Sequence, residues 1–204
     1  MLKEKSMSKQ EEYMDWDNMH SSLEALFVLD NALTEPEDDD IRLVRKYEDK
    51  QTVKYIVDNG VGDILTVIFS ETAVLVKGFA HENSLNQYAA DEWNQSIIDK
   101  MYYGLDEKLK NLFTDDEMKE TTFFIWYDGE VHQNKIDDND GGRWLLGFAF
   151  NTYERFKEFA TDYYDIEFDN DLLRQLYTCS KLSELELSKL IQGGIDSNGC
   201  NTVC

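Results

Sequence analysis

The fold class is decided by residues 64–79, which read ILTVIFSETAVLVKGF. Two apolar runs, Ile64–Phe69 and Ala73–Phe79, are rich in the β-branched and aromatic residues that fit strands. Only the turn at 70–72 separates them, and so short a connection joins antiparallel strands. The stretch therefore predicts a pair of neighbouring antiparallel strands.

Further strands are predicted on either side of this pair. Residues 53–57 alternate between apolar and polar side chains, apart from Ile56, and lead into the turn signal at 58–60. The run Thr122–Tyr127 reaches Asp128-Gly129, a strong two-residue hairpin signal, so residues 130–136 are the expected return strand. We expect an antiparallel sheet of about four to six strands.

Helical periodicity appears before, within and after the strand-rich region. Apolar residues recur at three- and four-residue steps over 13–29, and again from Tyr153 to Tyr163. Ser183 with Glu186 forms a capping box for a last helix, which Gly193-Gly194 is expected to end. Shorter helices are expected over 93–102 and 105–113.

The grouping of strands before helices predicts an α+β fold, with the helices packed on one side of the sheet. The chain of 204 residues is long enough to bury a core without disulfides. We expect an N-terminal helix and acidic loop over 1–40, a single α+β domain over 41–194, and a disordered tail over 195–204.

Charge is the strongest functional signal. The chain carries 42 acidic and 20 basic side chains, a formal net charge of -22. A field of this sign repels nucleic acid and anionic membranes and favours a basic protein as partner. No apolar run reaches the ~20 residues of a membrane span, and the charged N-terminus has no signal-peptide core. We therefore expect a cytoplasmic protein.

The densest acidic segment also contains aromatic residues. Six acids and no base lie between Glu158 and Asp171, interleaved with tyrosines and a phenylalanine. One interpretation is an ordinary solvated helix face beside a core stripe. The sharper one is a docking surface, because aromatic side chains anchor interfaces and charge steers encounters. Its candidate binding residues are Asp162, Tyr164, Asp165 and Asp169.

His81, Glu82 and His132 form the alternative site, that of a metal-dependent or hydrolase-like enzyme. His81-Glu82 follows a predicted strand and could approach His132 if the strands pair, but a zinc site needs three or four converging ligands. Adjacent side chains on an extended chain point to opposite faces, so both can join one site only if the chain bends after Gly78. We expect no metal and no cofactor, with His81 and Glu82 retained as candidate binding residues.

Two other motifs do not support a site. The segment 137–142, DDNDGG, resembles a calcium loop, but neither glycine register places ligands at positions one, five and twelve of an EF-hand. It is predicted to be a polar turn. Cys179 is expected to be a small core residue, and Cys200 and Cys204 do not form a prenylation motif.

Four segments in order resemble a widespread family of uncharacterised bacterial proteins: Val76–Glu82, Thr122–Tyr127, Gly142–Leu146 and Tyr163-Tyr164. The resemblance covers roughly 59–191, and it implies a role like that of immunity proteins in toxin systems. The chain departs from the family pattern at Ala80, where Asp is usual, and at Phe124, where Cys is usual.

These observations favour a non-catalytic, acidic, cytoplasmic protein-binding module, and the resemblance implies an immunity-type inhibitor of a basic toxin. A regulatory or structural interaction module is the third class that the composition allows. The oligomeric state is not indicated by the sequence.

Overall fold

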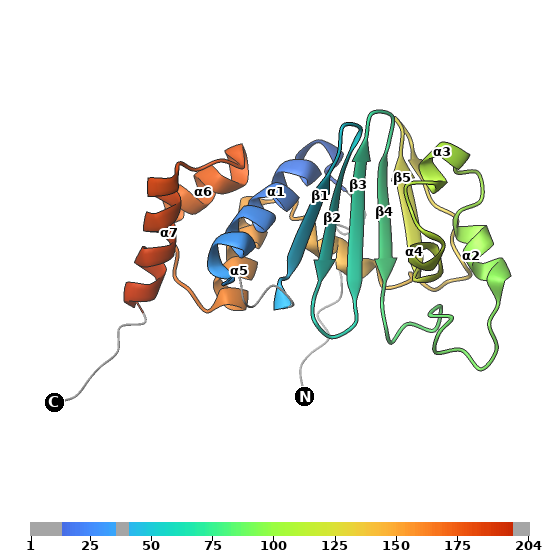
Figure 1. Ribbon diagram of the computed structural model, residues 1–204. Helices are drawn as coiled ribbons and strands as arrows, with labels where there is room; N and C mark the ends of the chain where they lie inside the picture. The colour runs from blue at the N-terminus through green and yellow to red at the C-terminus, as the bar shows by residue number, and fades with distance from the viewer. Residues whose placement is uncertain (1–13, 36–40, 198–204) are drawn as a thin grey trace. The chain divides into compact units, whose positions relative to one another are not determined.

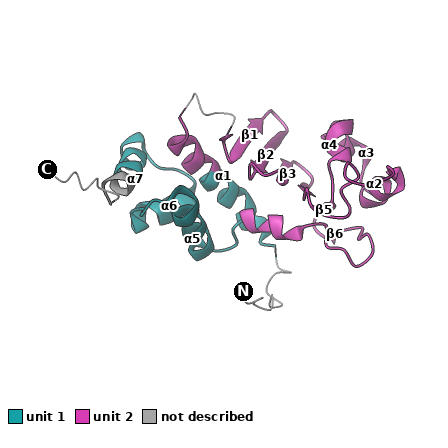
Figure 2. Ribbon diagram, turned by 90° about the horizontal axis from the view of Figure 1, so that it is seen from below, with its two compact units in different colours: residues 1–26, 149–204 teal, residues 27–148 magenta. Residues whose placement is uncertain are grey.

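The computed structural model describes residues 14–35 and 41–197. They divide into two compact units (Figure 2). Unit 1 combines residues up to Leu26 with those from Ala149 onward, and unit 2 comprises Phe27–Phe148. The boundary between the units falls within the N-terminal helix, between Leu26 and Phe27, whereas the sequence-based prediction places a boundary at residue 40.

Unit 2 is built on one antiparallel sheet whose six strands follow one another in chain order (Figure 1). The strands are β1 (Val44–Glu48), β2 (Thr52–Asp58), β3 (Ile64–Ser70), β4 (Val74–Phe79), β5 (Phe123–Tyr127) and β6 (Val131–His132). The α+β class and the antiparallel sheet predicted from the sequence are confirmed. The β5–β6 turn lies at Asp128-Gly129 as predicted, where the Asp128 N–H donates to the Glu130 carbonyl.

One face of the sheet carries the core beneath three short helices. Ile68, Leu75 and Trp126 stand in register across β3, β4 and β5, and Phe124 lies one pleat further along. They join a single buried cluster with Ile98 and other residues of the helical layer. The helices are α2 (Gln95–Met101), α3 (Glu107–Lys110) and α4 (Asp115–Lys119), which lie together beside β4 and β5 in Figure 1.

The opposite face also has a helical cover, which corrects the expectation of helices on one side. Tyr55 and Val67 are paired on this face and fully buried. The Lys46 ammonium lies 5.8 Å from the ring centroids of both Tyr55 and Phe27, so helix α1 (Trp16–Leu33) meets the sheet here through its second half. The 3-10 helix η3 (Arg143–Phe148) lies against β3. The central strands β3, β4 and β5 are largely buried on both faces because their side chains are mostly apolar.

Unit 1 is helical. Besides the first half of α1 it contains α5 (Tyr153–Tyr164), α6 (Asn170–Cys179) and α7 (Glu184–Ser197). Its fully buried side chains include Phe156, Leu173 and Leu176. The Tyr177 hydroxyl donates to the Phe150 carbonyl at 2.8 Å and accepts from the Asn18 side-chain amide at 2.6 Å, which ties α6 to α1.

Several helices and strands begin or end at other residues than the sequence predicts. Helix α7 continues to Ser197 through Gly193-Gly194, because glycine weakens a helix by only about 1 kcal/mol and does not block its hydrogen bonds. Residues 195–197 of the expected tail are therefore helical, and 198–204 lie outside the described residues. The return strand expected over 130–136 shortens to Val131–His132. Within the described residues no helix is both long and apolar enough to cross a bilayer.

Candidate functional site

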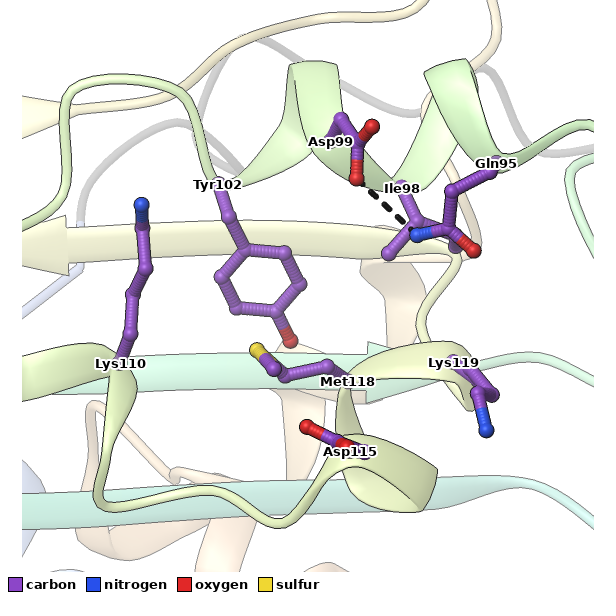
Figure 3. Close-up of a pocket in the computed structure, with 8 residues that line it drawn as sticks. All are labelled: Gln95, Ile98, Asp99, Tyr102, Lys110, Asp115, Met118 and Lys119. Carbon is purple, nitrogen blue, oxygen red and sulfur yellow. Dashed lines mark hydrogen bonds between the residues drawn. The ribbon is translucent and has the colours of Figure 1, made fainter. Parts of the chain in front are cut away.

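A pocket of about 320 Å³ opens between the helices that cover the sheet of unit 2 (Figure 3). Its residues are Gln95, Ile98 and Asp99 of α2, the α2 cap residue Tyr102, Lys110 of α3, and Asp115, Met118 and Lys119 of α4. The volume lies at the lower end of the range for ligand pockets, which is enough for one long side chain or a small molecule.

The floor of the pocket is apolar and firmly held. Ile98 and Tyr102 are 3% and 4% exposed. The Tyr102 ring packs against Phe124 with ring centroids 4.3 Å apart, and against the edge of Phe113 at 6.1 Å. Such tilted and edge-to-face contacts add to the stability gained by burial alone. The ring therefore has a fixed position between the pocket and the strand β5.

A buried polar network continues below the floor. The Tyr102 hydroxyl lies 2.9 Å from Thr121 Oγ1, which in turn donates to the Glu117 carbonyl at 3.4 Å. From the sheet side, Lys77 Nζ donates to the carbonyls of Glu117 and Glu120 at 2.9 and 2.6 Å. The carbonyls at the end of a helix lack partners within it, so Lys77 satisfies the C-terminal end of α4.

The network shifts the pKa values of its titratable side chains. Burial lowers the pKa of Lys77 to about 8, although the nearby Glu120 and Glu117 carboxylates raise it. Burial raises the pKa of the Tyr102 hydroxyl, which stays protonated and neutral. Burial also favours the neutral form of Glu117, but its hydrogen bonds from Lys54 and Thr114 outweigh this and leave its pKa below the usual value. The amine of Lys54 pairs with that carboxylate.

The rim of the pocket carries charges of both signs. Lys110 Nζ pairs with Glu107 at 2.6 Å and Lys119 Nζ with Asp116 at 3.0 Å, and neither acid lines the pocket. Asp99 accepts a hydrogen bond from the neutral Gln95 amide at 3.0 Å. Asp115 is the first residue of α4. Both lysines are thus countered by their own partners.

The predicted residues His81 and Glu82 lie directly after β4 and contact each other. His81 Nδ1 is 3.0 Å from Glu82 Oε1, and their side chains are 55% and 94% exposed. The backbone N–H of His81 donates to the Asp63 carboxylate at 2.7 Å. The pair is a solvent-exposed contact within a loop.

His132 lies elsewhere on the sheet. It faces Trp126 across β5–β6, stacks on that indole with centroids 4.8 Å apart, and lies 2.9 Å from the Asp128 carboxylate. Trp126 pairs with Leu75, near the start of β4, whereas His81 follows the end of that strand. The four residue steps from Leu75 to the end of β4 alone span about 13 Å. The structure therefore does not bring His81, Glu82 and His132 together.

The segment predicted as a docking surface forms the end of α5 and the loop to α6. Glu158, Asp162 and Asp165 follow one another at four- and three-residue steps and so share one face of the helix. Tyr163 lies next to this row, is 46% exposed, and stacks on Phe159 with centroids 5.2 Å apart. Tyr164 is half-buried and meets Tyr163 edge to face at 4.9 Å.

Two of the predicted binding residues also define the ends of helices. Asp165 is the C-cap of α5 in the left-handed conformation, with φ 53°. The Asp169 carboxylate is the N-cap of α6 and accepts from the backbone N–H groups of Asp171 and Leu172, each at 3.0 Å. Asp169 thus has a structural role that its position in an acidic run did not reveal, while its charge still adds to the surface.

The remaining motifs behave as turns or surface groups. In the segment 137–142, Asn139 and Asp140 accept hydrogen bonds from Gly141 and Gly142, which closes a polar turn. Cys179 is exposed, which corrects its assignment to the core: the buried stripe of α6 consists of Leu173, Leu176 and Tyr177. Cys200 and Cys204 lie outside the described residues. Among the residues described, no three His, Cys, Asp or Glu side chains form a group that could hold a metal.

Comparison with protein-family models, with curated proteins and with solved structures found no match to this chain.

Sequence reasoning missed the pocket and the network beneath it. Its one visible signal is Lys77, a charged residue inside the otherwise apolar run of β4, which is only 2% exposed. A charge on a buried strand needs nearby partners, and here they are backbone carbonyls. Tyr102 and Thr121 carry no such signal, since an aromatic residue and a threonine are ordinary in a core.

Proposed function

We propose that this chain is an acidic protein-binding module that recognises a basic protein, and that the end of α5 is its binding surface. The surface, called the α5 acidic face below, comprises Glu158, Asp162, Tyr163, Tyr164, Asp165 and Asp169. The observation that carries the proposal is the exposed Tyr163 beside a row of carboxylates, in a segment without a single basic residue.

The two kinds of side chain supply different parts of binding. The carboxylates attract a positively charged partner over a distance and raise the association rate. Tyr163 supplies a large, rigid contact that can lose its water in the complex, the role that tyrosine fills at interface hot spots. Because Tyr163 already stacks on Phe159, its side chain loses less conformational entropy on binding.

A basic toxin is the narrower identity that we propose for the partner, for which this chain acts as the immunity-type inhibitor in the bacterial cytoplasm. The net charge of -22 supports a basic partner, and the resemblance of the four segments at 76–82, 122–127, 142–146 and 163–164 supports the immunity role. The enzyme alternative has no such support, because His81 and His132 occupy separate parts of unit 2.

The test uses the purified products of the genes adjacent to that of this chain. Equilibrium binding is measured by calorimetry for the wild type, for Tyr163→Ala and for Tyr103→Ala, a matched control in unit 2 that is 76% exposed. We expect Tyr163→Ala to weaken binding by about 30-fold or more, as hot-spot truncations do. Equal affinities of the two variants would contradict the assignment of the face.

A second measurement addresses the narrower identity. If the basic product is a toxin, a stoichiometric amount of this chain should abolish its activity, and Tyr163→Ala should require a higher concentration. A basic product that binds tightly and keeps its full activity would support the binding module but exclude the immunity role.

A further inference from the structure

The pocket of unit 2 combines an apolar floor with an uncompensated negative rim. Ile98, Tyr102 and Met118 form the floor and one wall, as Figure 3 shows. The Tyr102 hydroxyl is already hydrogen-bonded to Thr121, and it stays neutral, so the residue adds no charge to the pocket. A ligand must therefore have an apolar or planar body.

The charges at the rim determine whether the pocket favours a positively or a negatively charged ligand. Lys110 and Lys119 are each paired with an acid outside the pocket, Glu107 and Asp116. By contrast, neither of the two lining carboxylates, Asp99 and Asp115, forms an ion pair within the part of the chain that the structure describes. Asp115 raises the pKa of Lys119 less than Asp116 does. The pocket as a whole thus presents negative charge.

We propose that this pocket binds the side chain of an arginine from a partner polypeptide. The methylene stem of arginine can cover the apolar floor while its charged end stays at the rim. Tyr102 is only 4% exposed, so it contributes to the apolar floor under this stem and does not offer an open ring face for stacking. The five N–H donors of the guanidinium suit carboxylates placed on different sides, as Asp99 and Asp115 are in Figure 3.

Other ligand classes fit less well. A purely apolar side chain would bury part of Asp99 and Asp115 without a partner, which costs free energy. An anion would meet the same two carboxylates, while the lysines that could attract it are already paired. The inference rests on the proposed function in that a basic partner supplies the arginine, but it concerns a site in the other unit.

The rim provides a means of detection. Trp93 is 41% exposed, and its indole N–H donates to the Gln95 side chain at 3.1 Å, while Gln95 itself lines the pocket. Tyr88 packs edge to face on Trp93 with centroids 5.3 Å apart. Occupation of the pocket should therefore change the indole environment as well as the backbone amide resonances of α2 and α4.

The experiment titrates the intact chain with the peptide acetyl-Gly-Arg-Gly-amide and records amide resonances and tryptophan fluorescence. Peptides with glutamine or glutamate in place of arginine are the controls, and agmatine represents a free guanidine. We expect saturable changes at residues 95–119 with the arginine peptide and with agmatine, which shares its guanidinium, and none with the glutamine or glutamate peptide. The Asp99→Asn and Asp115→Asn variants should each weaken binding by about tenfold, the usual effect of losing a charge-assisted hydrogen bond.

The control variant Glu71→Gln carries the same change of charge on an exposed turn of the same unit and should bind as the wild type does. The proposal is overturned if the arginine peptide causes no saturable change, if the glutamine or glutamate peptide binds equally well, or if agmatine binds and the peptide does not. Because no natural partner is needed, these results are independent of those for Tyr163. If Tyr163→Ala loses partner binding but no peptide binds the pocket, only the pocket proposal is refuted. If the arginine peptide binds the pocket but Tyr163→Ala binds the partner as the wild type does, only the α5 acidic face is refuted.

Discussion

The pocket of unit 2 and the α5 acidic face of unit 1 are both negative, but they are built in opposite ways. The pocket has a floor of buried side chains, such as Tyr102, fixed by aromatic packing and by the network that reaches Lys77. The α5 acidic face has no cavity, and its carboxylates stand on one side of a helix in contact with solvent. A pocket with fixed walls can discriminate between ligand groups by their shape. An exposed charged face mainly raises the rate of association with a partner.

The same contrast holds for stability. Residues near the pocket are held by many long-range contacts, so changes there should reduce the free energy of unfolding strongly. Most residues of the α5 acidic face are exposed, so changes there should alter binding with little loss of stability.

Replacement of Trp126 by alanine should give the largest loss of stability. Trp126 is 7% exposed, packs on Phe124 with ring centroids 5.8 Å apart, and supports the stacked His132. The loss of its ring should lower the free energy of unfolding by about 3–5 kcal/mol, measured by denaturant titration. Tyr163→Ala, at the exposed face, should cost less than about 1 kcal/mol. Similar costs for the two variants would contradict the division.

Lys77 should make stability increase with pH. Its pKa of about 8 in the folded state is lower than 10.5, so the unfolded chain binds more protons between these values and folding becomes more favourable as pH rises. From pH 7 to 9.5 the wild type should gain about 2 kcal/mol relative to Lys77→Met. The raised pKa of Tyr102 destabilises the fold only above pH 10, outside this window.

Denaturant unfolding of both proteins at several pH values between 7 and 9.5 gives the comparison directly. All other titrating groups are shared, so their effects cancel in the difference between the two proteins. Parallel stability curves would mean that Lys77 is not held in a desolvated site.

The cap at Asp169 should have a smaller effect. Its carboxylate accepts from two backbone N–H groups at the start of α6, so Asp169→Ala should lower the free energy of unfolding by about 1 kcal/mol. Asp169→Asn should leave stability nearly unchanged, because asparagine caps helices as well as aspartate does. An equal loss in both variants would show that the charge, and not the hydrogen bonds, matters at this position.

Much of the fold could be predicted because the decisive signals are local. The two apolar runs within residues 64–79 predict two strands, and Asp128-Gly129 predicts a hairpin that the structure contains. Strand β1 was not predicted, since its sequence VRKYE has only two apolar or aromatic members and gains its order by pairing with β2. Pairing of this kind is a tertiary effect that a short window of sequence does not show.

The candidate sites divide in the same way. The acidic run at 158–171 is visible in the sequence, although the capping role of Asp169 is not. The pocket could not be predicted, because Tyr102, Lys110 and Asp115 come from separate short elements that meet only through the packing of unit 2. His81 and His132 looked like partners on the assumption that paired strands align them, but the register places them apart.

The most direct test of the proposed function is the salt dependence of the association rate with a basic partner. Two variants with equal net charge are compared with the wild type: one carries Asn in place of Asp162, Asp165 and Asp169. The other carries Glu71→Gln, Asp91→Asn and Glu130→Gln, at exposed acids of unit 2. Asparagine tolerates the left-handed conformation at position 165 and caps α6 at 169, so the first variant should fold normally.

The association rate of the wild type, measured by stopped flow, should fall steeply as salt increases. The α5 variant should associate several-fold more slowly at low salt and show a weaker salt dependence, while the unit 2 variant should stay close to the wild type. If the two variants slow association equally, only the net charge matters and the α5 acidic face is not the binding surface. If neither salt nor either variant changes the rate, the acidic protein-binding function itself is contradicted.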